Sequence, residues 1–410
     1  MRDVRVGLPA GAIGANIDAV ACPSSSRCVG IGSSYYRDRR APVLVIMGMG
    51  SSWTAATVQM PADAQNPSSV GSEPLTLACP TVSSCVGVGS YNGPAGHSQG
   101  LLVIKSGREW AALRAPLPAN TGHIADAMLT AVACGSASRC VAVGSYTDSA
   151  GRSEGMLLTG AGRSWTALEV TATLTAVACA SAAMCVATGS YRTLSGTEGV
   201  LITGAGTSWT ATEAPMPPNA SATPETDLSA VTCQTRLTCV AVGGYSQSSG
   251  QQDGLLVTGS GKSWTATEAP GTGYLDRVAC SPATCVAVGG SSTELASGSG
   301  TSWKGVSLPL PANAKKGMPG VSLYSAACST GPECTIVGGY TTTKSLGEGL
   351  LVTGAGTSWT AAEAPLPPDG ARSTDALFES VACPFASTCL AAGTYNNYVL
   401  DQPLLVIMLK

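Results

Sequence analysis

The sixteen cysteines of this chain form eight pairs, and their spacing points to two kinds of chemistry. Four or five residues separate the two cysteines of each pair, and a pair recurs about every 52 residues. Two thiols so close in sequence can be oxidised to a disulfide across a hairpin, or they can ligate a metal ion together. The pairs are Cys22/Cys28, Cys79/Cys85, Cys134/Cys140, Cys179/Cys185, Cys233/Cys239, Cys280/Cys285, Cys328/Cys334 and Cys383/Cys389.

The surrounding sequence favours disulfides over metal ligation. Structural zinc sites use shorter cysteine spacings and histidines at set intervals, whereas this chain has only His97 and His123, neither in such a pattern. Buried, reduced cysteines are the other alternative, but they need no regular pairing. We therefore predict one hairpin disulfide per repeat, no metal and no cofactor. Disulfides persist in oxidising compartments, so we expect a secreted, extracellular protein, although the sequence shows no secretory signal.

A recurring tyrosine and a recurring acid could bind sugars. The tyrosine closes the apolar run after the second cysteine (Tyr36 in the first repeat), and the acid precedes the next apolar run. An exposed tyrosine ring can cover the C–H face of a sugar, while a carboxylate accepts hydrogen bonds from its hydroxyls. Alternatively, each tyrosine packs at a strand end and each acid lies in a solvated turn. The candidate ligand contacts are Tyr91, Tyr146, Tyr191, Tyr245, Tyr340, Glu154, Glu198, Asp253 and Glu348.

Each repeat contains four short apolar runs, which we name strands a to d in chain order. Strand a ends at the first cysteine and strand b begins at the second. Strand c is a run such as residues 155–160, and strand d begins at a Ser-Trp pair such as Ser164-Trp165. Gly, Ser and Pro clusters separate the runs, and no stretch keeps a helical period. Four short strands in a repeat of this length are typical of a propeller blade.

The two ends of the chain complement each other. Seven tryptophans mark seven strands d, one fewer than the cysteine pairs. The last repeat stops after its strand c at residues 403–410, while residues 6–10 resemble the end of a strand d. The N-terminal segment should therefore complete the last blade and close the ring, which leaves no open edge there. We predict an all-β fold, an eight-bladed β-propeller with four antiparallel strands per blade. An open solenoid, the alternative, would need polar caps at both ends.

We expect one domain over residues 1–410. Its blades are expected at 15–66, 67–122, 123–172, 173–218, 219–271, 272–312, 313–368 and 369–410, with residues 1–14 supplying the outer strand of blade 8. The tryptophans of the strands d are expected to fill the blades rather than to stack on ligands. They are Trp53, Trp110, Trp165, Trp209, Trp264, Trp303 and Trp359.

The loops should differ between the two faces of the ring. With strand a innermost, the a–b and c–d turns share one face, and they are uniform in length. The b–c and d–a loops share the other face and vary in length, and variable loops on a rigid scaffold often carry function. The d–a links before Cys179 and Cys280 are very short, as is the b–c loop near Glu294. Low blades beside high ones predict a groove across this variable-loop face.

Composition excludes two classes of partner. Only 11% of the residues are charged and the net charge is −3, so there is no basic surface for nucleic acid. No apolar run reaches the length of a membrane span. The expected partners are a surface glycan or polysaccharide, and a further protein subunit of a secreted complex.

Two resemblances follow from the repeat. The turn Gly204-Ala-Gly-Thr-Ser-Trp209 resembles a degraded Asp-box of sialidase-type propellers, with Gly204 in place of the Asp. More closely, Val132-Ala-Cys134, Cys140-Val-Ala-Val-Gly144 and Gly206-Thr-Ser-Trp209 resemble the cysteine-paired repeats of secreted actinobacterial proteins. Such propellers are similar to the lectin subunits of Streptomyces umbrella toxin particles. That resemblance implies an antibacterial targeting subunit, although the repeat carries no assigned chemistry.

We predict a lectin-like binding module that recognises a cell-surface glycan through the variable-loop face, and no catalysis. A sialidase needs an arginine triad, yet only Arg277 lies in an inner strand. Two alternatives stay open. A protein–protein docking scaffold would show a broad apolar patch. A degenerate sialidase-like glycosidase would show paired, buried carboxylates with raised pKa.

Overall fold

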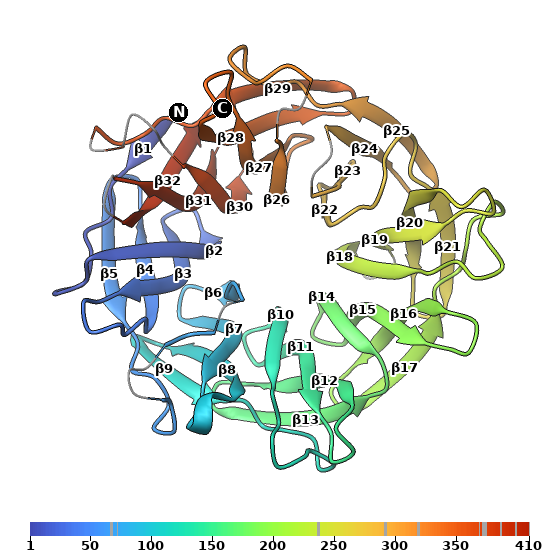
Figure 1. The fold of residues 1–410 in the computed structure, drawn as a ribbon, viewed down its shortest axis with the longest axis horizontal. Coiled ribbons are helices and arrows are strands. Elements are labelled where there is room, and N and C mark those ends of the chain that lie inside the picture. Colours follow the sequence, from blue (N-terminus) through green and yellow to red (C-terminus); the bar gives the residue numbers. More distant parts are fainter. Residues whose placement is uncertain are drawn as a thin grey trace.

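Eight four-stranded antiparallel sheets stand around a central axis in the computed structural model of the protein (Figure 1). The predicted eight-bladed β-propeller is confirmed. The structure describes residues 1–65, 69–71, 73–235, 238–290, 293–317, 320–368, 370, 375–385, 388–397 and 400–409. Within these ranges the only helix is one short 3-10 turn, η1 (Pro94–Gly96).

The strands nearest the axis are strands a, and each pairs with the strand b that follows it. The strands a are β2 (Gly14–Ser24), β6 (Thr76–Thr81), β10 (Met128–Ser136), β14 (Thr173–Ser181), β18 (Asp227–Thr235), β22 (Arg277–Cys280), β26 (Ser322–Cys328) and β30 (Leu377–Phe385). The strands b are β3 (Arg27–Tyr35), β7 (Ser84–Asn92), β11 (Arg139–Thr147), β15 (Met184–Arg192), β19 (Thr238–Ser246), β23 (Cys285–Val288), β27 (Cys334–Thr341) and β31 (Thr388–Asn396).

Strands c and d complete each sheet outward, and blades 1 to 8 are numbered after their strands a in chain order. The strands c are β4 (Val43–Met49), β8 (Ser98–Ser106), β12 (Ser153–Ala161), β16 (Thr197–Ala205), β20 (Gln252–Ser260), β24 (Glu294–Ser299), β28 (Gly347–Ala355) and β32 (Asp401–Leu409). The strands d are β5 (Ser52–Thr57), β9 (Glu109–Arg114), β13 (Ser164–Val170), β17 (Ser208–Glu213), β21 (Ser263–Glu268), β25 (Ser302–Ser307), β29 (Ser358–Glu363) and, for blade 8, β1 (Arg2–Val4).

The N-terminal strand closes the ring as predicted. β1 runs antiparallel to β32, with Val4 opposite Leu405, and the two chain ends lie side by side in Figure 1. Val4 and Leu405 share a buried apolar cluster with Ile17 of the first blade. The closing strand therefore completes the sheet of blade 8 and also the apolar packing between blades 8 and 1.

All eight predicted disulfides are present. They join strands a and b of one blade, as where Cys134 lies directly opposite Cys140. Eight such bonds fit an oxidising, extracellular environment.

The second cysteine of each pair is a buried core residue, so this half of the predicted cysteines cannot belong to a ligand-accessible site. Each has at most 1% of its surface exposed, because it opens a strand b that other strands cover on every side. The first cysteine of each pair is only partly buried. The cysteines therefore act structurally, through the bond and through packing. The buried members are Cys28, Cys85, Cys140, Cys185, Cys239, Cys285, Cys334 and Cys389.

The tryptophans of the strands d are structural, as expected. Each of the seven packs in an apolar cluster between blades. In six blades the indole nitrogen donates to the carbonyl of a glycine three residues earlier, as from Trp165 to Gly162 at 2.8 Å. Gly162 has φ of +52°, a conformation that favours glycine in this turn. In blade 2 the ammonium group of the buried Lys105 donates to the corresponding carbonyl, that of Gly107. The indole nitrogen of Trp110 has no hydrogen-bond partner among the described residues.

A β-bulge near the start of strand a directs one side chain of each affected blade towards its neighbour. The bulge leaves unpaired the residue four positions before the first cysteine, such as Thr130 in β10. Thr130 Oγ1 donates to the carbonyl of Leu174 in the next blade, and Ser229 Oγ donates to that of Leu275. The same position holds Asp18, Thr175, Tyr324 and Glu379 in other blades.

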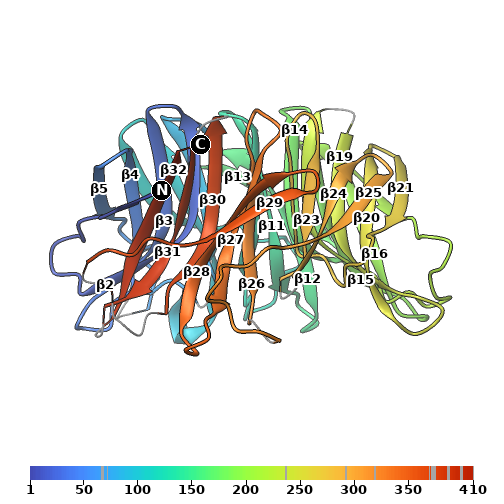
Figure 2. The ribbon, with the colours of Figure 1, turned by 90° about the horizontal axis from the view of Figure 1, so that it is seen from above.

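The two faces of the ring differ as expected. Figure 2 shows the longer loops extending from one edge of the ring, where the b–c and d–a loops lie. The opposite edge carries the a–b hairpins with their disulfides and the c–d turns. Among the described residues, no helix has the length and apolar character needed to cross a membrane.

Replacing both Cys134 and Cys140 with alanine should lower the free energy of unfolding by roughly 2 kcal/mol, because the bond closes a loop of about seven residues in the unfolded chain. The midpoint of urea denaturation measures the change. The exposed substitution Arg163→Ala, on the same face, should leave that midpoint unchanged. An unaltered midpoint in the cysteine double variant would contradict a stabilising role for the hairpin disulfides.

Candidate functional site

Most tyrosines that close strand b are buried against the preceding d–a loop. Tyr146 has 1% of its surface exposed, and its hydroxyl donates to Asn120 Oδ1 at 2.6 Å. The same contact joins Tyr245 to Asn219 at 2.9 Å and Tyr340 to Asn313 at 2.9 Å, while Tyr91 donates to Asp63 Oδ1 at 2.7 Å. The expectation of exposed rings is therefore wrong for Tyr91, Tyr146, Tyr245 and Tyr340, because a loop residue satisfies each hydroxyl within the fold.

In three blades the loop residue that accepts the tyrosine hydroxyl also contacts a side chain of strand d that is its complement in charge or hydrogen bonding. In blades 5 and 7 the amide of the loop asparagine donates to a glutamate of strand d, from Asn219 to Glu268 at 2.8 Å and from Asn313 to Glu363 at 2.7 Å. Where the loop supplies Asp63, strand d supplies Arg114, 3.4 Å away. We call the hydrogen bond from the tyrosine hydroxyl to the loop residue the tyrosine–loop contact, and in blades 2, 5 and 7 a side chain of strand d supports it.

Burial and these contacts perturb the tyrosine hydroxyls. Burial raises the pKa of Tyr340, and the carboxylate of Glu363 raises it further. The pKa of Tyr245 is also raised by burial, against an opposing effect of the hydrogen bond with Asn219. These hydroxyls therefore remain protonated donors at any physiological pH.

Blade 1 departs from this pattern. Six residues after the second cysteine, where six other blades have the tyrosine, the chain has Ser34, which is fully buried. Tyr36 was expected at this position but lies two residues further on, under the guanidinium of Arg40 at 4.7 Å. The preceding loop has Gly11 where others have asparagine or aspartate, so both partners of the contact are missing together.

The predicted acids lie directly across the strand pair from the tyrosines. Glu154 faces Tyr146, Glu198 faces Tyr191, Asp253 faces Tyr245 and Glu348 faces Tyr340. The recurring tyrosine and the recurring acid are therefore cross-strand neighbours in these four blades. Glu154, Asp253 and Glu348 are largely buried, however, and only Glu198 is partly exposed.

Tyr191 is the predicted tyrosine that stays open, because the loop before blade 4 is too short to cover it. β13 ends at Val170 and β14 begins at Thr173, which leaves no room for an asparagine over the ring. Tyr191 is partly exposed, and its hydroxyl donates to Glu213 Oε2 at 3.2 Å. A cavity of about 630 Å³, the blade-4 cavity, lies beside it.

The blade-4 cavity is polar and carries both signs of charge. Its walls are Arg152, Ser153, Glu154, Thr171, Ala172, Thr173, Thr175, Ser190, Tyr191, Arg192, Thr197 and Asp227. Arg152 is held by Asp148 at 2.7 Å, whereas Arg192 is exposed to solvent. Glu198, across from Tyr191, has its pKa raised by burial and by the nearby Glu213 and Glu225. This combination suits a ligand rich in hydroxyl groups.

A second cavity of about 380 Å³, the blade-1 cavity, lies between blades 8, 1 and 2 and holds a pair of acids that spacing alone could not bring together. Asp18 and Glu379 stand at the same bulge position of neighbouring strands a, and both line it. Asp18 Oδ2 accepts from the backbone N–H of Leu75 at 3.0 Å, and Asn16 donates to its other oxygen at 2.5 Å.

The Asp18 and Glu379 carboxyls differ from ordinary surface acids. Burial raises the pKa of Asp18 to about 7, against the hydrogen bond from Leu75, and the charge of Glu379 raises it as well. Burial also raises the pKa of Glu379, while Arg277 opposes the rise. Near neutral pH, Asp18 is therefore partly protonated and can act as a proton donor.

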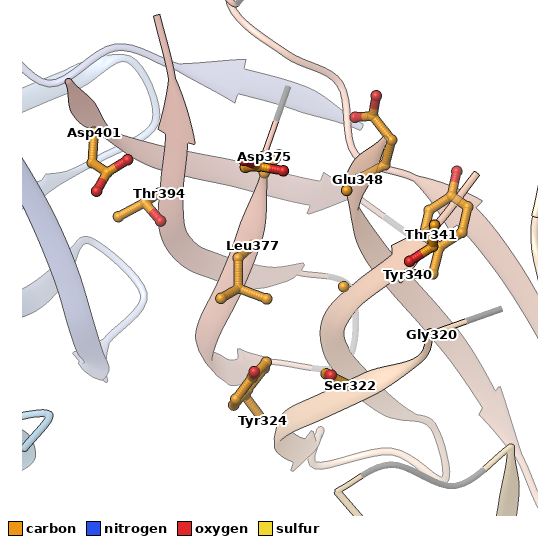
Figure 3. Close-up of a pocket in the computed structure, with 13 residues that line it drawn as sticks. Gly320, Ser322, Tyr324, Tyr340, Thr341, Glu348, Asp375, Leu377, Thr394 and Asp401 are labelled. Atoms are coloured by element: carbon orange, nitrogen blue, oxygen red, sulfur yellow. The ribbon is translucent and has the colours of Figure 1, made fainter. Parts of the chain in front are cut away.

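A third cavity of about 290 Å³, the blade-7 cavity, lies between blades 7 and 8. Figure 3 shows its side chains, which come from both blades. Tyr324 of β26 and Leu377 of β30 supply apolar surface, while Asp375 and Asp401 supply exposed carboxylates. All three cavities lie at the loop-face ends of strands a and b.

Within the described ranges, no group of three or more His, Cys, Asp or Glu side chains is arranged to hold a metal ion.

No protein-family model and no curated protein matches the chain. Solved structures similar to it include the Trypanosoma rangeli sialidase in complex with sialic acid, at 10% identity and a TM-score of 0.40 over 97% of this chain and 54% of that one. The chain thus spans about half the length of that sialidase. It is also similar to the lectin BP39L from Burkholderia pseudomallei, at 13% identity and a TM-score of 0.46, over 87% of this chain and 99% of that one. A puromycin-hydrolysing peptidase of Mycobacterium tuberculosis is similar at 11% identity and a TM-score of 0.46, over 95% of this chain and 59% of that one.

Two sequence signals could have revealed this arrangement. The first is the Pro-x-Asn or Pro-x-Asp sequence in the d–a loops, as at Pro118 to Asn120, which is absent before blade 4. The second is a polar residue four positions before the first cysteine, such as Asp18, within an otherwise apolar strand. The first marks the covered tyrosines, and the second marks the bulge residues that line the cavities.

The substitution Asn219→Asp should destabilise the protein by about 1–2 kcal/mol, because it replaces an amide donor with a carboxylate facing Glu268. Adding Glu268→Arg should restore stability, since the double variant copies the Asp63–Arg114 pair of blade 2. Urea denaturation of the two single variants and the double variant measures the coupling. Additive losses would show that the charge matching has no energetic role.

Proposed function

We propose that the protein is a secreted, non-catalytic, lectin-like module that binds a cell-surface glycan in the blade-4 cavity. One observation carries the proposal: Tyr191 lacks the loop residue that covers its counterparts, and so its ring borders an open polar cavity. A partly exposed ring can lie against the C–H face of a sugar. The surrounding hydroxyls, carboxylates and guanidinium groups can bond to the sugar's hydroxyls.

The remaining predicted contacts take two different roles in this proposal. Glu154 and Tyr191 line the blade-4 cavity, and Glu198 faces Tyr191 across the strand pair. Tyr91, Tyr146 and Tyr245 hold the d–a loops in place through their hydroxyls. Asp253 belongs with this buried framework. Tyr340 and Glu348 border the blade-7 cavity.

Binding of the oxidised protein to a microbial glycan array tests the proposal. The substitutions Tyr191→Ser and Arg192→Ala should each weaken binding to the recognised glycan by roughly 10- to 100-fold, as expected for losing one stacking or charge-assisted contact. Serine stands at the position of Tyr191 in blade 1, so this replacement suits the fold. Arg163→Ala, on the opposite face, is the matched control. Equal binding by all variants, or no binding by the parent protein, would contradict the proposal.

A second candidate function is glycoside hydrolysis in the blade-1 cavity, favoured by the paired carboxyls of Asp18 and Glu379. Glycosidases use one protonated and one ionised carboxyl. Asp18, with its pKa of about 7, would be the proton donor.

If this activity exists, hydrolysis of fluorogenic glycosides should fall as pH rises through about 7, because Asp18 then loses its proton. Asp18→Asn should lower the rate by at least roughly 10²-fold, whereas Asp38→Asn, an exposed carboxylate elsewhere, should not. Hydrolysis by the Asp18 variant at the parent rate would exclude Asp18 as the acid. Absence of hydrolysis across the panel would leave the binding function alone.

A further inference from the structure

The blade-4 and blade-7 cavities are built from the same positions of the repeat. Six and four residues before the first cysteine stand Thr173 and Thr175 in blade 4, and Ser322 and Tyr324 in blade 7. Six residues after the second cysteine stand Tyr191 and Tyr340, which also line the two cavities. The cavities are therefore two copies of one structural position with different side chains.

In a further copy of this position, between blades 5 and 6, the protein's own ring occupies the space. Tyr274 lies over Gly244 so closely that an added Cβ on Gly244 would be 2.3 Å from the ring. The Tyr274 hydroxyl bonds to Asp227 Oδ2 at 3.0 Å and to Ser229 Oγ at 2.9 Å. These are the residues six and four positions before the first cysteine of blade 5. The position thus accepts a flat ring whose hydroxyl reaches the start of strand a.

The residue that corresponds to Tyr274 decides whether the position is filled or open. It stands six residues before the first cysteine of the following blade, and it is Asp227 for the blade-4 cavity and Leu377 for the blade-7 cavity. Leu377 still packs over Gly339, where an added Cβ would lie 3.0 Å from it. Being shorter than tyrosine, it leaves about 290 Å³ open above Ser322 and Tyr324.

We propose that the blade-7 cavity is a second sugar site, so that one molecule holds two parts of the same polysaccharide. This inference rests on the proposed glycan binding. Tyr324 and Leu377 offer apolar surface to one face of a sugar ring, and Asp375 and Asp401 accept hydrogen bonds from its hydroxyls (Figure 3). No lysine or arginine is among the described residues that line it, so the site selects a neutral ring over an acidic one.

Two sites on one face change how the protein binds a long chain. The blade-4 and blade-7 cavities lie three blades apart on the variable-loop face. A polysaccharide that reaches both is held by a second, intramolecular contact. Such a contact can raise the apparent affinity by roughly 10²- to 10⁴-fold. A short oligosaccharide, which occupies one cavity at a time, gains nothing from the second.

The test is a calorimetric titration with a tetrasaccharide cut from the strongest polysaccharide on the glycan array. Leu377→Tyr should remove one equivalent of bound tetrasaccharide, because a tyrosine there fills the blade-7 cavity as Tyr274 fills its own copy. Tyr191→Ser should remove a different equivalent, and the double variant should lose both. Leu194→Tyr, the same substitution at a fully exposed loop residue, is the matched control and should bind as the parent does.

Each outcome separates the second site from the first. An unchanged stoichiometry in Leu377→Tyr would overturn the second site while leaving the blade-4 site intact. If only Leu377→Tyr removes an equivalent, the blade-4 proposal fails and the second site stands. No binding by the parent protein would overturn both. Should Leu377→Tyr fail to fold, Asp375→Asn with Asp401→Asn, two exposed changes, should weaken the same equivalent at least roughly 10-fold, and unchanged binding would contradict the proposal.

Discussion

Every blade of this protein depends on burying both faces of its sheet against its neighbours, and this requires a closed ring. The strand pair β1–β32 provides the closure, and Val4 and Leu405 bury the seam against Ile17 of the first blade. Because no blade can move without exposing apolar surface, loops on the rim are held at fixed positions. The hairpin disulfides and the tryptophan turns reinforce individual blades. Closure fixes how neighbouring blades are placed relative to one another, and all three cavities are lined by residues of neighbouring blades.

The tyrosine–loop contact decides which of the repeated tyrosines are covered. Where Asn120, Asn219 or Asn313 accepts the hydroxyl, the long loop lies over the ring and the tyrosine is part of the framework. Where the loop is short, as before blade 4, the same tyrosine is available to a ligand. A repeat can therefore carry the same tyrosine in six of eight blades and leave it open to a cavity in blade 4. This explains how a uniform scaffold can produce a local site without new strands.

The architecture was predictable from the sequence because its signals are periodic. Paired cysteines at fixed spacing indicate a hairpin bond, and a missing strand d at one end with a spare one at the other indicates closure. Burial of Tyr146 was not predictable in this way, since a strand-end residue can face solvent or a loop with the same local pattern. The pairing of Asp18 with Glu379 was missed as well, because it depends on β-bulges that place both residues at the lining of one cavity. The short link before Cys179 did locate a cavity, since loop length acts locally. The link before Cys280 has a different effect, because its Tyr274 fills the position between blades 5 and 6.

The central claim is that the missing loop over Tyr191 creates the recognition site. Grafting residues 115–127, the loop that covers Tyr146, in place of residues 170–172 tests this directly. The graft supplies an asparagine acceptor for the Tyr191 hydroxyl and covers the blade-4 cavity while leaving the ring intact. If the claim is right, the grafted protein keeps its thermal stability and loses glycan binding at blade 4. A folded graft that binds the glycan as the parent does would contradict the claim.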